Sequence, residues 1–335
     1  MNQHLNPADA ARRLGVSPKA LRLYEQRGLI RPLRSAAGWR AYGPVEMARA
    51  AEIVGLRGLG LSLAQIGRVL DGDVRGLAPA LAAHQAGLER RMQDLAAMLD
   101  RVRALRADLG RGEAPAAAAL AATLAPPRPA VAFDLPWPWG GERFEWRDIP
   151  ALTWITGPLG SGKTRLAQAL AAALPGGRFL GLDRQADMGG ASSPAVAHDL
   201  AWLVEDGATP SEALAALLGG IQAAAPGPVV IDMIEQGLDE ATQAAVAAWA
   251  RNRRPEAGPL LAMTRSTAML DLAAVGPDEA IILCPANHAP PLRVAPWPGS
   301  PGYEAVATCL AAPGVRARTA GVIAFRPPAS APPPR

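Results

Sequence analysis

One segment of this 335-residue chain carries a complete phosphate-binding motif. Residues 157–164 read Gly-Pro-Leu-Gly-Ser-Gly-Lys-Thr, with the spacing G-x-x-x-x-G-K-T. In such a loop, backbone N–H groups curl around phosphate oxygens at the start of a helix, a lysine reaches the β- and γ-phosphates, and a threonine hydroxyl binds Mg²⁺. The expected nucleotide-binding residues are Gly157, Gly160, Ser161, Gly162, Lys163 and Thr164.

A carboxylate further along the chain completes the expected metal site. The apolar run at 228–231 predicts a buried strand, and Asp232 follows it directly. Asp232 and Thr164 could together order the Mg²⁺ shell, so we expect ATP or ADP bound with Mg²⁺. The chain has 34 Lys and Arg residues, of which only Lys19 and Lys163 are lysines. Because arginine's planar group does not reproduce a compact ammonium, a lysine at 163 indicates a chemical requirement.

The elements around the motif resemble those of ABC-type ATPases, specifically the compact branch of the RecF and SMC proteins. An apolar run at 151–156 predicts a strand before the loop, and 165–174 predicts a helix after it. Apolar segments at 260–272 and 277–283 continue the order. The resemblance covers about residues 142–285 and implies an α/β nucleotide-binding domain with a mainly parallel sheet.

The resemblance fails at the residues that would cleave ATP. Met233 stands where these ATPases place the catalytic glutamate, and Arg265 where they place the switch histidine. Positioned acid–base catalysis contributes about 10² to 10⁴ in rate, and its loss leaves phosphate and metal binding in place. We therefore expect ATP binding with weak or absent hydrolysis. Glu235 is the one candidate catalytic residue, and its reach depends on the turn after Asp232.

Two tryptophans before the loop allow two interpretations. Trp137 and Trp139 lie 26 and 24 residues before Lys163, near the place where these ATPases stack an aromatic ring on adenine. They could equally anchor the core or the preceding linker. The sequence leaves both open.

Helix start and stop signals in the first 75 residues predict a helix-turn-helix with a wing. Asn6-Pro7 and Ser17-Pro18 each supply an N-cap and a proline at the first helical position. Glycines 15 and 28 end these two short helices. Residues 29–42 suit a small β-hairpin, a further helix opens at Pro44, and Ser62 to Gln65 form a capping box for the next one.

From Leu77 the pattern becomes that of a long helix with one apolar stripe, about four heptads in length. Seven of the nine stripe positions are apolar; the positions are Leu81, His84, Leu88, Arg91, Leu95, Met98, Val102, Leu105 and Leu109. A lone helix would expose this stripe to water, so we expect a homodimer through the 77–109 helix. The alternative is packing within the same chain.

Three separated motifs in this region resemble the DNA-binding domain of MerR-type transcriptional regulators. They are Val-Ser-Pro-Lys-Ala-Leu-Arg-Leu-Tyr-Glu-Gln-Arg-Gly-Leu-Ile at 16–30, Gly-Trp-Arg-Ala-Tyr at 38–42 and Leu-Gly-Leu-Ser-Leu-Ala-Gln-Ile at 59–66. The resemblance covers about residues 5–109. It implies contacts with double-stranded promoter DNA from Lys19, Arg22 and Tyr24 on the recognition helix and from Arg40 on the wing.

The same resemblance implies partners and an effector class. Such regulators are homodimers joined by an antiparallel coiled coil, and they typically twist a promoter so that RNA polymerase can use it. Metal-sensing members hold the metal through cysteines at and beyond the dimerisation helix. Residues 71–130 contain no cysteine, so metal sensing is not expected.

Composition divides the chain into the parts that these motifs require. Residues 1–110 carry 17 Lys and Arg against 10 Asp and Glu, and the remainder carries 17 against 20, as for a basic DNA-binding head on a mildly acidic sensor. Neither a signal peptide nor an apolar run of about 18 residues occurs, so we expect a cytoplasmic protein without a membrane span. The predicted parts are a winged helix-turn-helix domain at 1–75, a dimerisation helix at 76–110, an Ala- and Pro-rich linker at 111–136, an α/β nucleotide-binding domain at 137–326 and a disordered tail at 327–335.

These patterns predict a MerR-like regulator whose promoter binding or distortion is modulated by ATP or ADP. Three alternatives remain for the second domain: a DNA-dependent ATPase, a P-loop small-molecule kinase, or a degenerate platform for protein interactions. The sequence does not distinguish an activator from a repressor.

Overall fold

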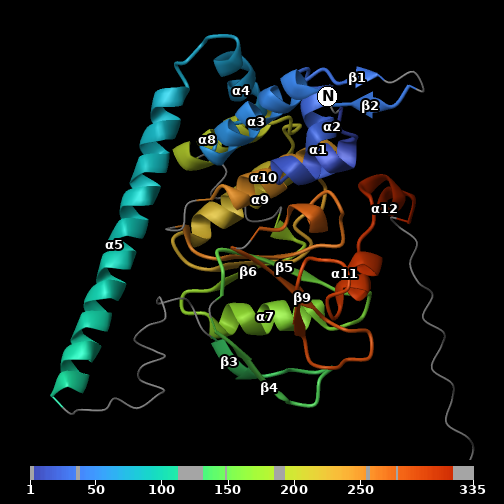
Figure 1. Ribbon diagram of the computed structural model, residues 1–335. Coiled ribbons are helices and arrows are strands. Elements are labelled where there is room, and N and C mark those ends of the chain that lie inside the picture. Colours follow the sequence, from blue (N-terminus) through green and yellow to red (C-terminus); the bar gives the residue numbers. More distant parts are fainter. Residues whose placement is uncertain are drawn as a thin grey trace, which may run out of the picture.

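The N-terminal part of the chain is a helical domain with a two-stranded wing (Figure 1). The computed structural model describes residues 4–34, 38–111, 131–147, 149–184, 193–253, 257–276 and 278–319. The first elements are α1 (Pro7–Leu14), α2 (Pro18–Gln26), β1 (Leu33–Arg34), β2 (Arg40–Ala41), α3 (Pro44–Gly58) and α4 (Leu63–Leu70). The Asn6 and Ser17 side chains accept hydrogen bonds from the first turns of α1 and α2, which confirms both predicted helix starts.

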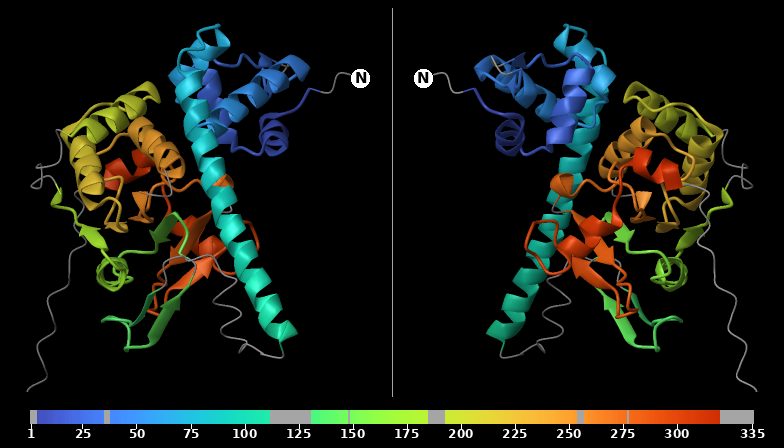
Figure 2. Two further views of the ribbon diagram at one scale, coloured as in Figure 1. Left: turned by 90° about the vertical axis from the view of Figure 1, so that its left-hand side faces the viewer. Right: turned by 90° about the vertical axis from the view of Figure 1, so that its right-hand side faces the viewer.

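Helix α5 (Leu77–Gly110) is one long helix along the side of the molecule (Figures 1 and 2). Its first turn, through Leu77 and Ala80, packs against the core of the helical domain. Beyond that turn, Leu81, Leu88 and Leu109 of the predicted stripe are 46, 46 and 53% exposed. These three stripe residues are therefore about half exposed in the part of the chain that the structure describes.

The C-terminal part is an α/β domain around a six-stranded sheet of order β10-β9-β5-β8-β7-β6. Five strands run parallel and β10 pairs antiparallel with β9, which confirms the predicted mainly parallel sheet. The strands are β5 (Leu152–Thr156), β6 (Arg178–Leu180), β7 (Val229–Ile231), β8 (Leu260–Met263), β9 (Glu279–Leu283) and β10 (Leu292–Val294).

Two hydrophobic clusters cover the two faces of this sheet. One cluster packs α7 (Lys163–Ala173) and the hairpin of β3 (Val131–Asp134) and β4 (Arg143–Trp146) on one face. The other packs α8 (Pro194–Glu205), α9 (Glu212–Ala224) and α10 (Glu240–Arg251) on the opposite face. The helical N-terminal domain sits on the α8 and α10 side (Figure 1).

The C-terminal domain begins earlier than predicted. Strand β3 opens at Val131, and Val131 and Leu135 are buried in the core, so the predicted linker is wrong over residues 131–136. Cross-strand packing of Phe133 on Phe144 overrides the Ala- and Pro-rich composition here. At the other end, α11 (Tyr303–Cys309) and α12 (Pro313–Thr319) follow β10. Most of the predicted linker, at 112–130, and the predicted tail lie outside the described residues.

Candidate functional site

The loop at 157–164 is positioned by β5 and by the segment that follows β9. Because β5, β8, β7 and β9 are parallel, their carboxyl ends meet at one edge of the sheet, where the loop lies. Gly157 has φ +152°, and a Cβ there would lie 2.4 Å from the Cys284 carbonyl oxygen. Gly162 has φ +88°, and a Cβ there would lie 2.6 Å from the Trp139 ring. Both positions therefore require glycine.

The side chain of Lys163, the first residue of α7, folds back onto this loop. Its Nζ donates to the Pro158 carbonyl at 2.6 Å and to the Ser161 hydroxyl at 3.4 Å. Burial lowers the pKa of this ammonium, and the charge of Arg265 lowers it further, against a raising effect from Cys284. The N–H groups of Gly162, Lys163 and Thr164 donate to no described residue. The loop thus offers a desolvated cation and unsatisfied donors at a helix N-terminus, which is the chemistry of a phosphate cradle.

Thr164 and Asp232 meet, as expected from the sequence. The Thr164 hydroxyl donates to the Asp232 carboxylate at 3.0 Å, and burial raises the pKa of Asp232. A hydroxyl and a carboxylate side by side are hard oxygen ligands, which fit Mg²⁺ when a nucleotide supplies further oxygens. Arg184 was not predicted. Its buried guanidinium donates to the Asp232 and Met233 carbonyls at 2.9 and 3.0 Å and so fixes this turn.

The Glu235 carboxylate lies at the edge of the candidate site, where two arginines bind one of its oxygens. Its Oε1 accepts a hydrogen bond from the Arg265 N–H at 3.0 Å and pairs with Arg316 of α12. Its Oε2 is buried without a partner among the described residues. The Arg265 guanidinium donates to no described residue, and its Nε is buried. Arg265 therefore adds a second positive charge close enough to Lys163 to lower the pKa of its ammonium.

The two tryptophans before the loop have different surroundings. Trp139 is 5% exposed, its ring lies against Gly162, and its Nε1 donates to the Ala289 carbonyl at 3.1 Å. Trp137 is 77% exposed. Trp139 therefore packs in the core beneath the loop. Of these two tryptophans, Trp137 has the ring that is exposed and could stack on a base.

The predicted DNA-reading residues divide into exposed and buried ones. Lys19 and Arg22 are exposed on α2, and Arg40 lies on the wing, where it pairs with Glu25. Tyr24 is 5% exposed in the core of the helical domain, where burial raises the pKa of its hydroxyl. Tyr24 was expected to contact DNA, but its ring lies on the buried face of α2 together with Leu21. The spacing of three residues places Leu21 and Tyr24 on one face of the helix, and this spacing could have indicated from the sequence that Tyr24 is buried.

Comparison with known proteins supports the interpretation of the first domain. Residues 5–73 match the profile described as MerR HTH family regulatory protein. An uncharacterised HTH-type transcriptional regulator of Pseudomonas aeruginosa is 35% identical over 106 residues, which are 78% of that protein and 29% of this chain. The chain belongs to the MerR HTH family of regulatory proteins. A probable heavy metal-dependent regulator of Haemophilus influenzae is 33% identical over 82% of its length, and the regulator CueR of Salmonella typhimurium is 30% identical over 78%.

These MerR-family relatives each align with about 30% of this chain, so they leave most of the C-terminal domain unmatched. Within the described residues, no cluster of three or more His, Cys, Asp or Glu side chains could hold a metal ion. None of the helices in that same part of the chain has the length and apolar character to span a membrane.

Proposed function

We propose that this MerR-family regulator binds promoter DNA as a homodimer, and that ATP or ADP with Mg²⁺ at residues 157–164 sets the strength of that binding or the distortion of the DNA. The observation that carries the nucleotide part is the loop itself. Lys163 is buried within it, Thr164 pairs with Asp232, and the first N–H groups of α7 find no acceptor among the described residues. An anion placed there would satisfy all of these groups at once.

Hydrolysis is expected to be slow or absent. A general base must come within hydrogen-bond reach of the attacking water. Met233 cannot act as a base, and the Oε1 of Glu235 is already held by the Arg265 N–H and by Arg316. Nucleotide occupancy, rather than turnover, would then be the signal. Arg265 would add a contact to the terminal phosphate and so distinguish ATP from ADP.

The exposed stripe of α5 supports a homodimer. Leu81, Leu88 and Leu109 lie on one helix, and the described residues of a single chain leave each of them about half exposed. Burial of such a stripe against a second α5 would remove that apolar surface from water. The partners expected at the promoter are double-stranded DNA, contacted by Lys19, Arg22 and Arg40, and RNA polymerase.

Isothermal titration of the full-length protein with MgATP and MgADP tests the nucleotide site. Lys163→Ala should weaken binding at least about tenfold, because a charged hydrogen-bond donor to phosphate is lost. Arg178→Ala is the matched control: it removes one positive charge from the same domain at the amino end of β6, the sheet edge opposite the loop. Wild-type protein that binds neither nucleotide at millimolar concentration would refute the proposal.

A true ATPase is the second candidate, favoured by the Oε2 of Glu235, which has no hydrogen-bond partner within the described part of the chain. Release of Arg316 would let this carboxylate accept a proton from water. ATP turnover that is stimulated by DNA and abolished by Glu235→Gln would establish this activity. A wild-type rate of ATP hydrolysis no higher than that of Glu235→Gln would exclude it.

A further inference from the structure

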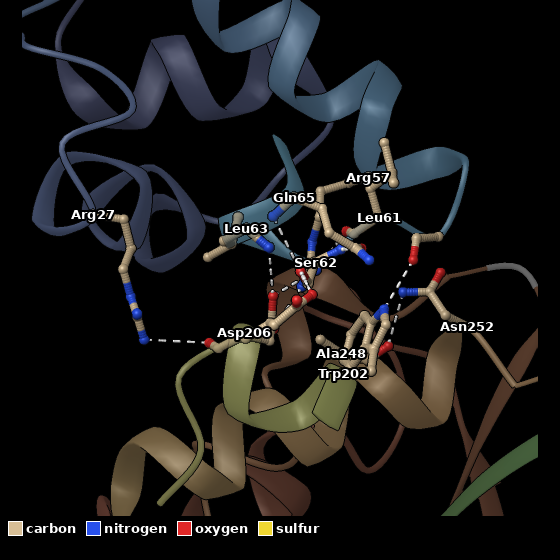
Figure 3. A network of polar contacts seen from close by, with 12 residues as sticks. Arg27, Arg57, Leu61, Ser62, Leu63, Gln65, Trp202, Asp206, Ala248 and Asn252 are labelled. Atoms are coloured by element: carbon tan, nitrogen blue, oxygen red, sulfur yellow. Dashed lines mark hydrogen bonds and ion pairs between the residues drawn. The ribbon is translucent and has the colours of Figure 1, made fainter. Parts of the chain in front are cut away.

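The helical domain is bound to the end of α8 by a buried ion pair (Figure 3). The carboxylate of Asp206, directly after α8, accepts hydrogen bonds from the Arg57 guanidinium at 2.8 and 3.0 Å and from the Leu63 N–H at 2.9 Å. The Asp206 side chain is 2% exposed. All its described hydrogen-bond partners belong to the helical domain, 143 or more residues away in the chain.

Neighbouring side chains extend this contact. Glu205 accepts from the Ser62 hydroxyl at 3.0 Å and from Arg68 at 3.1 Å. The Trp202 indole donates to the Gly60 carbonyl at 3.0 Å, and its ring lies under the Arg57 guanidinium. We call Trp202, Glu205 and Asp206, with the helical-domain groups they bind, the latch. The Asp206 carboxylate is both covered and hydrogen-bonded by the helical domain, so separation of the two domains would exchange these charge-assisted hydrogen bonds for contacts with water.

The docked position also places the C-terminal domain beside the DNA-reading helix. Ser17, Pro18 and Lys19 at the start of α2 form one wall of a cleft of about 400 Å³. The opposite wall includes Thr267, Leu270, Asp271 and Leu272 of the segment after β8, with Ala307 and Leu310. Lys19 lies 3.9 Å from Glu240 at the start of α10.

A DNA duplex cannot enter a cleft with a volume of about 400 Å³. A helix that reads bases enters a major groove about 12 Å wide and 8.5 Å deep, so DNA strands must pass on both sides of it. The segment at 267–272 stands on one of those sides in the docked protein. Glu240 in addition presents a negative charge where a phosphate would approach Lys19.

We infer that the latch is autoinhibitory: it holds the helical domain where α2 cannot enter a major groove, and DNA binding requires its release. The fold also offers a route by which bound nucleotide could release the latch, and this route rests on the proposed function. The segment that carries Asp232 and Glu235 continues into α10 and Glu240. The segment that carries Arg265 continues into residues 267–272. Both segments at the phosphate site therefore continue into residues that face the start of α2.

The test compares DNA binding by full-length wild type and Asp206→Ala without nucleotide, by fluorescence anisotropy with a short mixed-sequence duplex at fixed salt. Removal of one member of a buried ion pair strongly favours the undocked state, so affinity should rise at least about tenfold. Glu304→Ala, which removes an exposed carboxylate of α11, is the matched control and should change affinity less than twofold. An Asp206→Ala protein that melts as the wild type does and binds DNA equally would overturn the latch.

A second variant covers the case in which Asp206→Ala fails to fold. Glu205→Ala removes the contacts to Ser62 and Arg68 from a partly exposed position and should raise affinity by a smaller factor. Equal affinity of folded Glu205→Ala and wild type would then count against the latch. Hydrogen exchange at the Leu63 N–H should accelerate in either variant.

Measurements with MgATP, on the wild type and on Lys163→Ala, distinguish the latch from the proposed nucleotide signal. If MgATP raises DNA affinity in the wild type but not in Lys163→Ala, both the latch and its nucleotide release are supported. If Asp206→Ala gains affinity while MgATP binds to no protein, the latch stands and the nucleotide proposal fails. If MgATP binds but Asp206→Ala gains no affinity, the latch fails and the nucleotide site stands.

Discussion

Replacement of Trp139 by alanine tests whether the phosphate loop depends on the hairpin beneath it. The Trp139 side chain is buried in the cluster that joins α7 to β3 and β4, and it donates one hydrogen bond, to Ala289. Truncation of a buried tryptophan costs about 3 to 5 kcal/mol, since packing is lost and a cavity remains. For a domain of this size each kcal/mol lowers the melting temperature by about 2–4 °C, so a fall of roughly 6 to 20 °C is expected.

Trp137→Ala provides the control within the same segment. Its ring is 77% exposed, so its truncation should change the free energy of unfolding by less than about 0.5 kcal/mol. Differential scanning calorimetry of both variants without nucleotide measures the difference. Similar melting temperatures for the two variants would refute the assignment of Trp139 as the anchor.

The same pair of variants separates support of the loop from contact with the base. Trp139→Ala should weaken binding of MgADP and of inorganic triphosphate alike, because Gly162 loses the surface against which it packs. Trp137→Ala should weaken only ligands that carry adenine, if its free ring stacks on the base, where such stacking contributes about 1 to 3 kcal/mol. Unchanged adenine-nucleotide affinity in Trp137→Ala would remove the stacking interpretation.

Three further predictions concern pH, DNA and assembly. Burial raises the pKa of Asp232 above its unfolded value, so its proton stabilises the fold below the unfolded pKa, and this stabilisation is lost as pH rises through the folded pKa. Without nucleotide or Mg²⁺, the melting temperature of Asp232→Asn should therefore exceed that of the wild type by a margin that grows between about pH 4 and 7; a margin that shrinks would contradict this. Arg40→Ala should reduce the slope of log affinity for DNA against log salt by about 1, whereas Tyr24→Phe should leave the slope unchanged, because Tyr24 is buried. Leu88→Asp should yield monomers in analytical ultracentrifugation while Arg103→Ala does not, and dimers of both would exclude the α5 stripe as the interface.

The helix starts were predictable because their causes are local. Asn6, Ser17 and Ser62 each accept a hydrogen bond from an N–H three residues on, and such caps are visible in the sequence. The strand before residue 157 and the helix after 162 followed from apolar runs next to an uncommon motif. The pairing of Thr164 with Asp232 was also predictable, since parallel strands bring their carboxyl ends together.

Other features depend on contacts between distant segments. Nothing near Arg57 or Asp206 in the sequence indicates that they pair across 149 residues. Arg184 is one of many arginines, and only the turn after β7 explains its burial. The start of the hairpin of β3 and β4 was assigned to the linker because the residues before it are rich in Ala and Pro. The hairpin is stabilised by packing on α7, which the local sequence does not show.

The contact between Arg57 and Asp206 joins two parts of a single polypeptide, and this affects how the regulator would respond in a cell. A tethered inhibitor acts at an effective concentration set by the chain that connects it, not by the amount of protein made. The fraction of molecules held silent is then the same at low and at high copy number. Expression level would change how many regulators are available, while the threshold for their activation would stay constant.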